Sequence, residues 1–110
     1  FGSQWQNAFR VLQGENAPLD VRAENVNTDR SIDRGLFQIN SNTFRKLLNH
    51  ARWGKVMREQ GITSFEDMFD PVKNIAMARI VFDERASWDR NGWNAWYGAP
   101  ADLRGRFASL

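Results

Sequence analysis

Two carboxylates, Glu15 and Asp33, have the residue type and the surroundings for acid–base chemistry. Glu15 follows the predicted end of a helix at Gly14, where the helix dipole disfavours an anion, and no basic residue lies at helical spacing from it. An acid placed there against aromatic surface tends to keep its proton, as a general acid must. Asp33 is surrounded by amides and hydroxyls that keep a carboxylate ionised. This contrast suits glycosidic bond cleavage, but two solvated surface acids would have the same spacing.

Amide and hydroxyl side chains crowd the segment around Asp33, namely Asn25, Asn27, Ser31, Gln38 and Asn40. Such groups match the hydroxyl and N-acetyl groups of sugars, or else they only serve the turns of a small hairpin. Tryptophans follow downstream, with Trp88, Trp93 and Trp96 inside nine residues. We expect one of Trp93 and Trp96 to line a cleft and leave Trp88 open. Trp5 and Trp53 are predicted to be core residues.

The composition fits one soluble domain over residues 1–110, of 12.7 kDa, because domains of about 100–150 residues are the commonest. The net charge of +2 is too small to indicate nucleic acid as a partner. The sequence lacks cysteine and has a single histidine, His50, so no metal or cofactor is expected. No apolar run approaches the roughly 18 residues of a membrane span. Because the chain starts at Phe1, we expect a monomeric domain excised from a longer protein.

The pattern of apolar residues predicts an α+β protein that is mostly helical, with one small hairpin and a buried central helix. Trp5, Ala8, Phe9 and Leu12 predict a helix that ends at Gly14, and the mixed residues from Ile32 to Ile39 predict the hairpin. Further helices are expected after Ser41, which can serve as the N-cap, around Trp53 up to Gly61, and near Ala101–Phe107. The central helix starts at Asp70 and Pro71, with an apolar face of Val72, Ile75, Ala76, Ala78, Ile80 and Phe82.

The motif "TDRSIDRGLFQINS" resembles the β-hairpin of the lysozyme superfamily, most closely that of the animal C-type lysozymes. Similar stretches occur in phage and bacterial wall-cleaving domains and in soluble lytic transglycosylases. Glu15 stands upstream at nearly the separation of that family's catalytic glutamate. Downstream, "DPVKNIAMARIVFDE" and "NGWNAWYG" look like its central helix and its Trp-bearing segment. The resemblance covers residues from about 8 to 100 and implies a lysozyme-like fold.

The resemblance also implies roles for single residues. Glu15 would be the general acid and Asp33 the second carboxylate, and Trp96 would lie near Glu15 and raise its pKa. The saccharide contacts would be Asn25, Asn27, Gln38, Asn40 and Trp96. Because the disulfides of the secreted animal enzymes are absent, the resemblance suggests a phage or bacterial module. Such a module acts outside the cell, at the wall or on a virion.

Three activities stay open at this point. The first is a muramidase that hydrolyses the β-1,4 bond between N-acetylmuramic acid and N-acetylglucosamine in the glycan strands of peptidoglycan. The second is a lytic transglycosylase, which needs only the glutamate and forms 1,6-anhydro-muramic products. The third, of another class, is a non-catalytic glycan-binding or structural virion module, since a fold does not fix a function.

Overall fold

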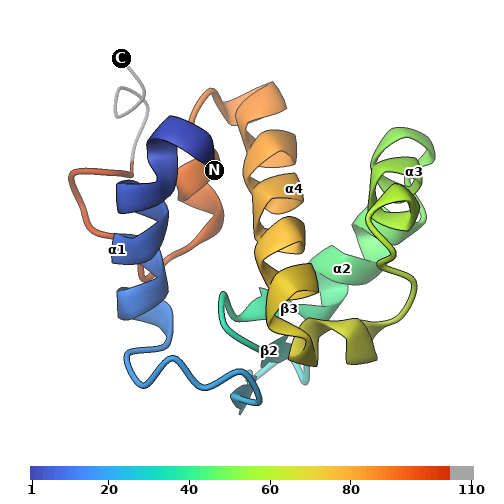
Figure 1. Cartoon of the computed structure of the whole chain (residues 1–110), viewed down its shortest axis with the longest axis horizontal. Coiled ribbons are helices and arrows are strands. Elements are labelled where there is room, and N and C mark those ends of the chain that lie inside the picture. Colours follow the sequence, from blue (N-terminus) through green and yellow to red (C-terminus); the bar gives the residue numbers. More distant parts are fainter. Residues whose placement is uncertain (105–110) are drawn as a thin grey trace.

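The computed structural model describes residues 1–104 and has the α+β architecture, mostly helical, that the sequence predicts (Figure 1). A three-stranded antiparallel sheet lies at one end of the helices. The elements in chain order are η1 (Gly2–Gln4), α1 (Trp5–Glu15), β1 (Glu24–Val26), β2 (Ile32–Arg34), β3 (Ile39–Asn40), α2 (Ser41–Leu48), α3 (Ala51–Glu59), η2 (Phe65–Phe69), α4 (Pro71–Asp89) and η3 (Gly92–Ala95).

Helix α1 differs from the prediction in its end and in its buried side. It runs one residue past Gly14, so Glu15 is its last residue and the backbone N–H of Asn16 bonds to the carbonyl of Leu12. Its buried residues are Ala8 and Val11, whereas Trp5 is 61% exposed. The predicted core position of Trp5 is therefore wrong. The aromatic ring that packs on Trp93 is instead that of Phe1, before the helix, at 5.5 Å between ring centroids.

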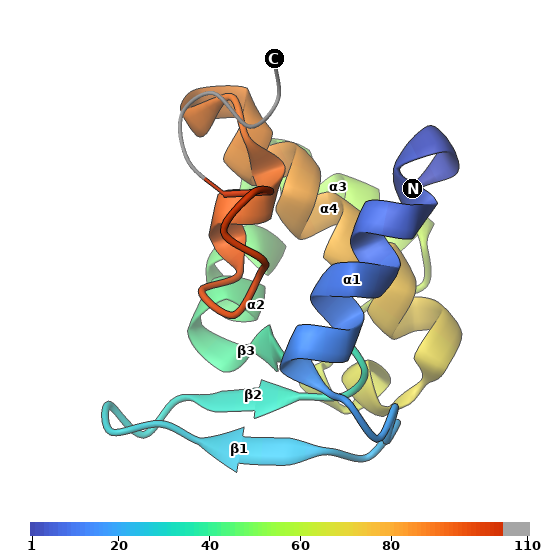
Figure 2. The same cartoon turned by 90° about the vertical axis from the view of Figure 1, so that its left-hand side faces the viewer.

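The sheet contains the predicted hairpin and one strand more. β2 and β3 pair in antiparallel register across the turn 35–38, and β1 adds to the other edge of β2 through the turn 27–31. The predicted hairpin between Ile32 and Ile39 is thus confirmed, but its range misses β1. In Figure 2 both β1 and β2 extend away from the helices toward the 27–31 turn.

A buried amide, that of Asn74, holds the β2–β3 turn against the helices. Its Oδ1 accepts a hydrogen bond from the backbone N–H of Phe37 at 2.8 Å, and its Nδ2 donates to the carbonyls of Arg34 and Met68. Gly35 lies beside this amide with a φ of +78°, and a Cβ there would collide with Asn74 and with the Met68 carbonyl. The turn therefore requires glycine.

Helices α2 and α3 pack against each other and complete the helical layer beside α4. α2 starts at Ser41, but its N-cap is Asn40 and not the predicted Ser41, since Asn40 accepts from the N–H groups of Asn42 and Thr43. His50 caps α3 in the same way, and the chain turns at Gly61 as predicted. Trp53 is buried, which confirms its predicted place in the core.

Helix α4 lies between α1 on one side and α2 and α3 on the other (Figure 1). Asp70 caps it and Pro71 occupies its first turn, both as predicted. Its apolar face is rotated from the predicted one. Val72 is 75% exposed and Ile75 is also exposed, while the buried residues are Asn74, Met77, Ala78, Ile80 and Val81. None of the helices in the described part of the chain is long and apolar enough to cross a membrane.

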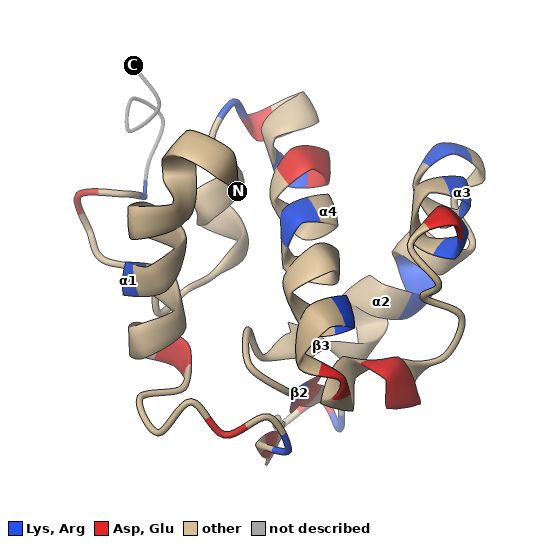
Figure 3. Cartoon of the chain, in the orientation of Figure 1, with Lys and Arg blue, Asp and Glu red and all other residues tan. Residues whose placement is uncertain are grey.

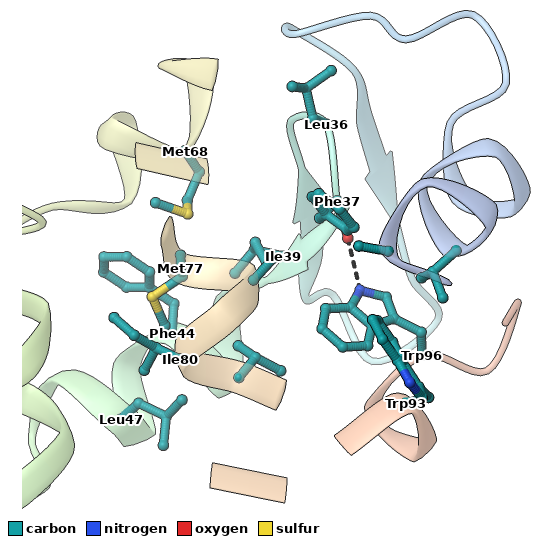
Figure 4. Close-up of a cluster of buried hydrophobic side chains, with 14 of the residues drawn as sticks. Leu36, Phe37, Ile39, Phe44, Leu47, Met68, Met77, Ile80, Trp93 and Trp96 are labelled. Atoms are coloured by element: carbon teal, nitrogen blue, oxygen red, sulfur yellow. Dashed lines mark hydrogen bonds between the residues drawn. The ribbon is translucent and has the colours of Figure 1, made fainter. Parts of the chain in front are cut away.

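The core joins α4 to the sheet, to α2 and to the tryptophan segment (Figure 4). Trp96 Nε1 donates to the Phe37 carbonyl at 3.0 Å, which ties that segment to the β2–β3 turn. The three methionines, Met57, Met68 and Met77, are fully buried core residues. After η3 the chain makes a turn at 101–103, so the predicted helix near Ala101–Phe107 does not begin there, and its residues 105–107 lie outside the described part.

Candidate active site

A cleft of about 740 Å³ brings Glu15 and Asp33 to one site. One side is the sheet with its 27–31 turn and the start of α2, and the other is the segment 95–98 after η3. Figure 2 shows these segments, with the hairpin below and the red C-terminal segment above. The lining residues are Glu15, Asn27, Thr28, Asp29, Ser31, Asp33, Gln38, Ile39, Asn40, Asn42, Thr43, Val81, Arg85, Ala95, Trp96, Tyr97 and Gly98.

Glu15 enters the cleft from the C-terminal end of α1, where burial raises the pKa of its carboxyl group. The negative charge of Asp33 raises this pKa further, whereas a hydrogen bond from Gly98 and the positive charge of Arg104 lower it. Partial burial removes water that would solvate the anion, so the neutral acid is favoured. The raised pKa agrees with the state of Glu15 expected from the sequence.

Two glycines permit the approach of α1 to the segment that carries Gly98. The backbone N–H of Gly98 donates to Glu15 Oε1 at 3.0 Å. A Cβ on Gly98 would lie 2.5 Å from that same oxygen, and a Cβ on Gly14 would lie 2.8 Å from the Gly98 carbonyl oxygen. Gly14 was expected to end the helix. Its actual place is inside α1, where it gives the last turn room against residues 96–99.

Asp33 lies in β2 opposite Asn40 of β3, and this register sets its hydrogen bonding. Asn40 Nδ2 donates to Asp33 Oδ1 and to Ser31 Oγ, at 2.9 Å each. Asn27 Nδ2 also donates to Ser31 Oγ, at 3.1 Å. Ser31 Oγ in turn donates to Asp29, whose hydrogen bonds with Ser31 lower the pKa of the Asp29 carboxyl group. Asp33 is therefore held in a chain of amides and hydroxyls, the surroundings that the sequence predicts.

Of the five predicted saccharide contacts, four line the cleft: Asn27, Gln38, Asn40 and Trp96. Asn25 does not, because its amide points within the sheet and donates to Gln38 Oε1 at 2.5 Å. Gln38 Nε2 donates to the carbonyls of Gly35 and Ala23, so this side chain supports the turn. Asn40 has a similar structural role as the cap of α2.

The tryptophans separate into core, cleft and surface positions. Trp93 is buried in the aromatic cluster with Phe82 and Phe1. Trp96 lines the cleft, although its indole is only 5% exposed, which confirms that one of the two borders a cleft. Trp88, left open by the sequence, is 61% exposed, and its Nε1 donates to Glu84 Oε1.

Several cleft residues escaped the sequence analysis, above all Gly98 and the pair Ser31 and Asp29 as a hydrogen-bonded unit. Gly98 is 83 residues from Glu15 in the chain, so no local pattern could reveal the contact. The resemblance covers the segment that holds Gly98, but it implies a role only for Trp96 in that segment. Within residues 1–104 no group of three histidine or acidic side chains is arranged to hold a metal ion.

Comparisons of the chain with protein-family models, with curated proteins and with solved structures gave no match. A function therefore has to be argued from the geometry of the cleft and from the motifs of the sequence.

Proposed function

We propose that this chain cleaves the glycan strands of peptidoglycan as a muramidase, with a lysozyme-like fold. The observation that carries the proposal is a single cleft with two carboxylates in opposite surroundings, Glu15 half-buried with a raised pKa and Asp33 held by an amide donor. A pair of this kind supplies the acid and the anion that glycosidic bond cleavage requires. The site would act at the bacterial wall, on the bond between N-acetylmuramic acid and N-acetylglucosamine.

Glu15 is the proposed general acid. Its Oε1 accepts the hydrogen bond from Gly98, so the proton of the neutral acid is placed on Oε2. From there the proton passes to the glycosidic oxygen as the bond to the sugar breaks. Burial keeps the acid protonated at a pH where an ordinary glutamate has lost its proton.

Asp33 is the proposed second carboxylate, facing the positive charge that develops on the sugar. Asn40 fixes one of its oxygens through a hydrogen bond of 2.9 Å, and preorganised charge of this kind stabilises a transition state without rearrangement. Either Asp33 stabilises the oxocarbenium ion while water attacks, or it bonds to the sugar and is released by water in a second step. In both cases one water molecule is consumed and a reducing sugar end is formed.

The remaining walls suit an N-acetylated sugar chain. Asn27 and Asn40 present amides on the sheet side, and Trp96 adds an apolar border across from them. Apolar ring faces and a few polar groups are the usual composition of a carbohydrate-sized site. Gln38 and Asn25 support this wall through their mutual hydrogen bond.

The test is digestion of purified peptidoglycan by the full chain, followed by mass spectrometry of the soluble products. A muramidase yields products with reducing N-acetylmuramic acid ends. Products with 1,6-anhydro-muramic ends would contradict hydrolysis and identify the chain as a lytic transglycosylase. In that alternative the muramic acid's own hydroxyl group attacks. In a transglycosylase, Asp33→Asn should reduce the cleavage rate only mildly, whereas in a hydrolase the reduction should be severe.

Glu15→Gln separates both enzymes from a non-catalytic module. Loss of general acid catalysis is expected to reduce the cleavage rate by about 10²–10⁴-fold. The amide keeps an oxygen for the Gly98 N–H and removes only the proton donor. An unchanged rate in Glu15→Gln would contradict a catalytic role, and no cleavage by the wild-type chain would favour a binding module.

A further inference from the structure

We propose that the helical hairpin of α2 and α3 is a second substrate contact that binds the carboxylates of the peptide stems on the glycan strand. This inference rests on the proposed function, because it names the part of peptidoglycan that the surface recognises. The surface consists of five cationic side chains, here called the α2–α3 basic face: Arg45, Lys46, Arg52, Lys55 and Arg58.

The charge of the chain is divided unevenly. Residues 41–61 hold these five cations and one acid, Glu59, and so carry +4. The other residues hold ten basic and twelve acidic side chains and so carry −2, which together give the net charge of +2. Figure 3 shows the blue segments gathered on α3 and on the adjoining end of α2. A local charge of this size attracts polyanions that the small net charge of the chain would not indicate.

The cations of the basic face are exposed and have no ion-pair partner within residues 1–104. The contacts that they do make are weak competitors for an anion. Arg45 Nη2 donates to the Asn42 amide oxygen, and Arg52 lies over the Trp53 ring at 4.5 Å. Elsewhere the ion pairs neutralise Arg10, Arg34, Lys73, Arg79 and Arg85.

Three of these cations follow one another along a single helix. Arg52, Lys55 and Arg58 follow one another at intervals of three residues on α3, so each step rises about 4.5 Å along the helix axis. Single exposed ion pairs contribute little free energy. A substrate with several linked carboxylates binds much more tightly than a single one, because after the first contact each further contact forms within the same complex.

The position of the basic face indicates which molecule carries the carboxylates that it binds. Lys46 lines a small hollow with Thr43, Arg85 and Trp88, and both Thr43 and Arg85 also line the main cleft. The hollow also contains the acid Glu84, but its Oε1 accepts the hydrogen bond from Trp88 Nε1. A strand that continues from the cleft over this hollow would therefore reach the basic face at Lys46. The anions nearest to such a strand are the peptide stems attached to its own muramic acid residues.

The experiment measures binding without turnover, in full-length protein with the Glu15→Gln substitution. The ligand is insoluble peptidoglycan freed of phosphate polymers by acid, and bound protein is separated by sedimentation over a series of salt concentrations. The variant is Arg45→Gln/Lys46→Gln/Lys55→Gln, which leaves Arg52 on its tryptophan. The matched control is Arg22→Gln/Arg79→Gln/Arg90→Gln, which removes the same charge from exposed positions outside the basic face and outside the cleft.

We expect the basic-face variant to bind peptidoglycan about tenfold more weakly at low salt, because three contacts are lost together. The control should bind within about twofold of the parent, since none of its three positions lines the cleft or the hollow beside it. Glycan strands whose peptides have been removed by an amidase should bind the parent and the basic-face variant equally. Lys55→Gln alone should show a smaller loss in the same direction, which serves as the measurement if the triple variant folds poorly.

Three results would overturn the proposal. An equal loss of binding in both triple variants would show that the effect depends only on the net charge of the protein. An equal difference on peptide-free strands would exclude the peptide stems. Binding to duplex RNA or to phosphatidylglycerol vesicles that depends on the basic face, without such dependence for peptidoglycan, would assign the surface to nucleic acid or to a membrane. A Glu15→Gln parent that still released soluble fragments would contradict the catalytic role of Glu15, and the comparison between the two triple variants would still test the basic face.

Discussion

The backbone N–H of Gly98 holds Oε1 of Glu15 at 3.0 Å, across 83 residues of sequence. This bond couples the last turn of α1 to the segment after η3, on the wall of the cleft opposite the sheet. It acts against burial, since it lowers the pKa of the Glu15 carboxyl group while burial raises it. The net effect is a raised pKa together with a fixed orientation of the carboxyl plane.

Gly98→Ala tests this coupling. The added Cβ would lie 2.5 Å from Glu15 Oε1, so the carboxyl group has to move, and a displacement of about 1 Å can cost roughly 100-fold in rate. We expect a loss of that order in peptidoglycan cleavage, with a stability loss of about 1–3 kcal/mol from overpacking. Gly2→Ala is the control for backbone strain without a collision, because its φ is +54° and no atom lies within 4 Å of a Cβ at that position. A cleavage rate unchanged in Gly98→Ala would mean that the carboxyl position is not critical.

The raised pKa of Glu15 also predicts how its removal changes stability with pH. Because the folded protein holds this proton more tightly than the unfolded chain, its stabilising contribution is complete below the ordinary glutamate pKa. That contribution is lost as the pH rises through the raised folded pKa. Glu15→Gln should therefore be more stable than the wild type at neutral pH, and the difference should vanish in acid. Thermal melts at both pH values measure this, and a Glu15→Gln chain less stable at neutral pH would contradict the sign.

The same pKa governs the alkaline side of the activity profile. Cleavage should decline as Glu15 loses its proton, at a higher pH than for a carboxyl group in water. Rates measured across pH on soluble glycan fragments locate this decline. Gly98→Ala serves here as a probe: alanine keeps the backbone N–H, but its Cβ displaces the Glu15 carboxyl group from that donor. Weakening a hydrogen bond that lowers the pKa should move the decline further toward alkaline pH. A shift toward acid pH would contradict the assignment of that limb to Glu15.

Asn40 has two roles, which two substitutions can separate. Its Oδ1 caps α2 and its Nδ2 holds Asp33. Asn40→Ser keeps a good cap, so stability should change by no more than about 0.5 kcal/mol, while cleavage should fall because serine cannot reach Asp33. Asn40→Ala should show the same activity loss with an added cost of about 1 kcal/mol. Denaturant unfolding and rate measurements on both variants check this, and full activity in Asn40→Ser would exclude the positioning role.

Asn74 should be one of the most sensitive positions for stability. Its amide satisfies three backbone groups, on Phe37, Arg34 and Met68, in a site without solvent access. Asn74→Ala leaves these groups unsatisfied and should cost about 3 kcal/mol or more in the free energy of unfolding. Asn42→Ala, at an exposed position of α2, is the matched control and should cost far less. A small loss in Asn74→Ala would show that the turn has other support.

Local signals in the sequence predicted the features that depend on near neighbours. Asp70 and Pro71 fix the start of α4 through hydrogen bonds and backbone angles within three residues, and Gly61 follows α3 with a positive φ. The hairpin was predictable because the turn residues "NTDR" precede a mixed run of apolar and polar residues from Ile32 to Ile39. The two candidate carboxylates were found through the contrast in their surroundings, and the cleft does contain both.

Features that depend on distant partners were missed or misjudged. Trp5 and Phe9 have helical spacing like core residues but are exposed, and the ring that packs on Trp93 is that of Phe1, which precedes the helix. The hydrogen bonds of Asn74 reach residues up to 40 positions away, so nothing near it in the sequence marks its role. Asn40 and Ser41 are both good caps, and only the strand register, which joins Asn40 to Asp33, decides between them.

The contact of Gly14 with the Gly98 segment determines where the specificity of this cleft can be redesigned. Neither glycine tolerates a larger residue, since each Cβ would lie within 2.8 Å of an oxygen on the other segment or on Glu15. These two positions of the wall therefore have to stay glycine. The exposed 27–31 turn faces it with Thr28 and Asp29, which have no place in the core. A library for new glycan preferences should therefore vary this turn and leave both glycines unchanged.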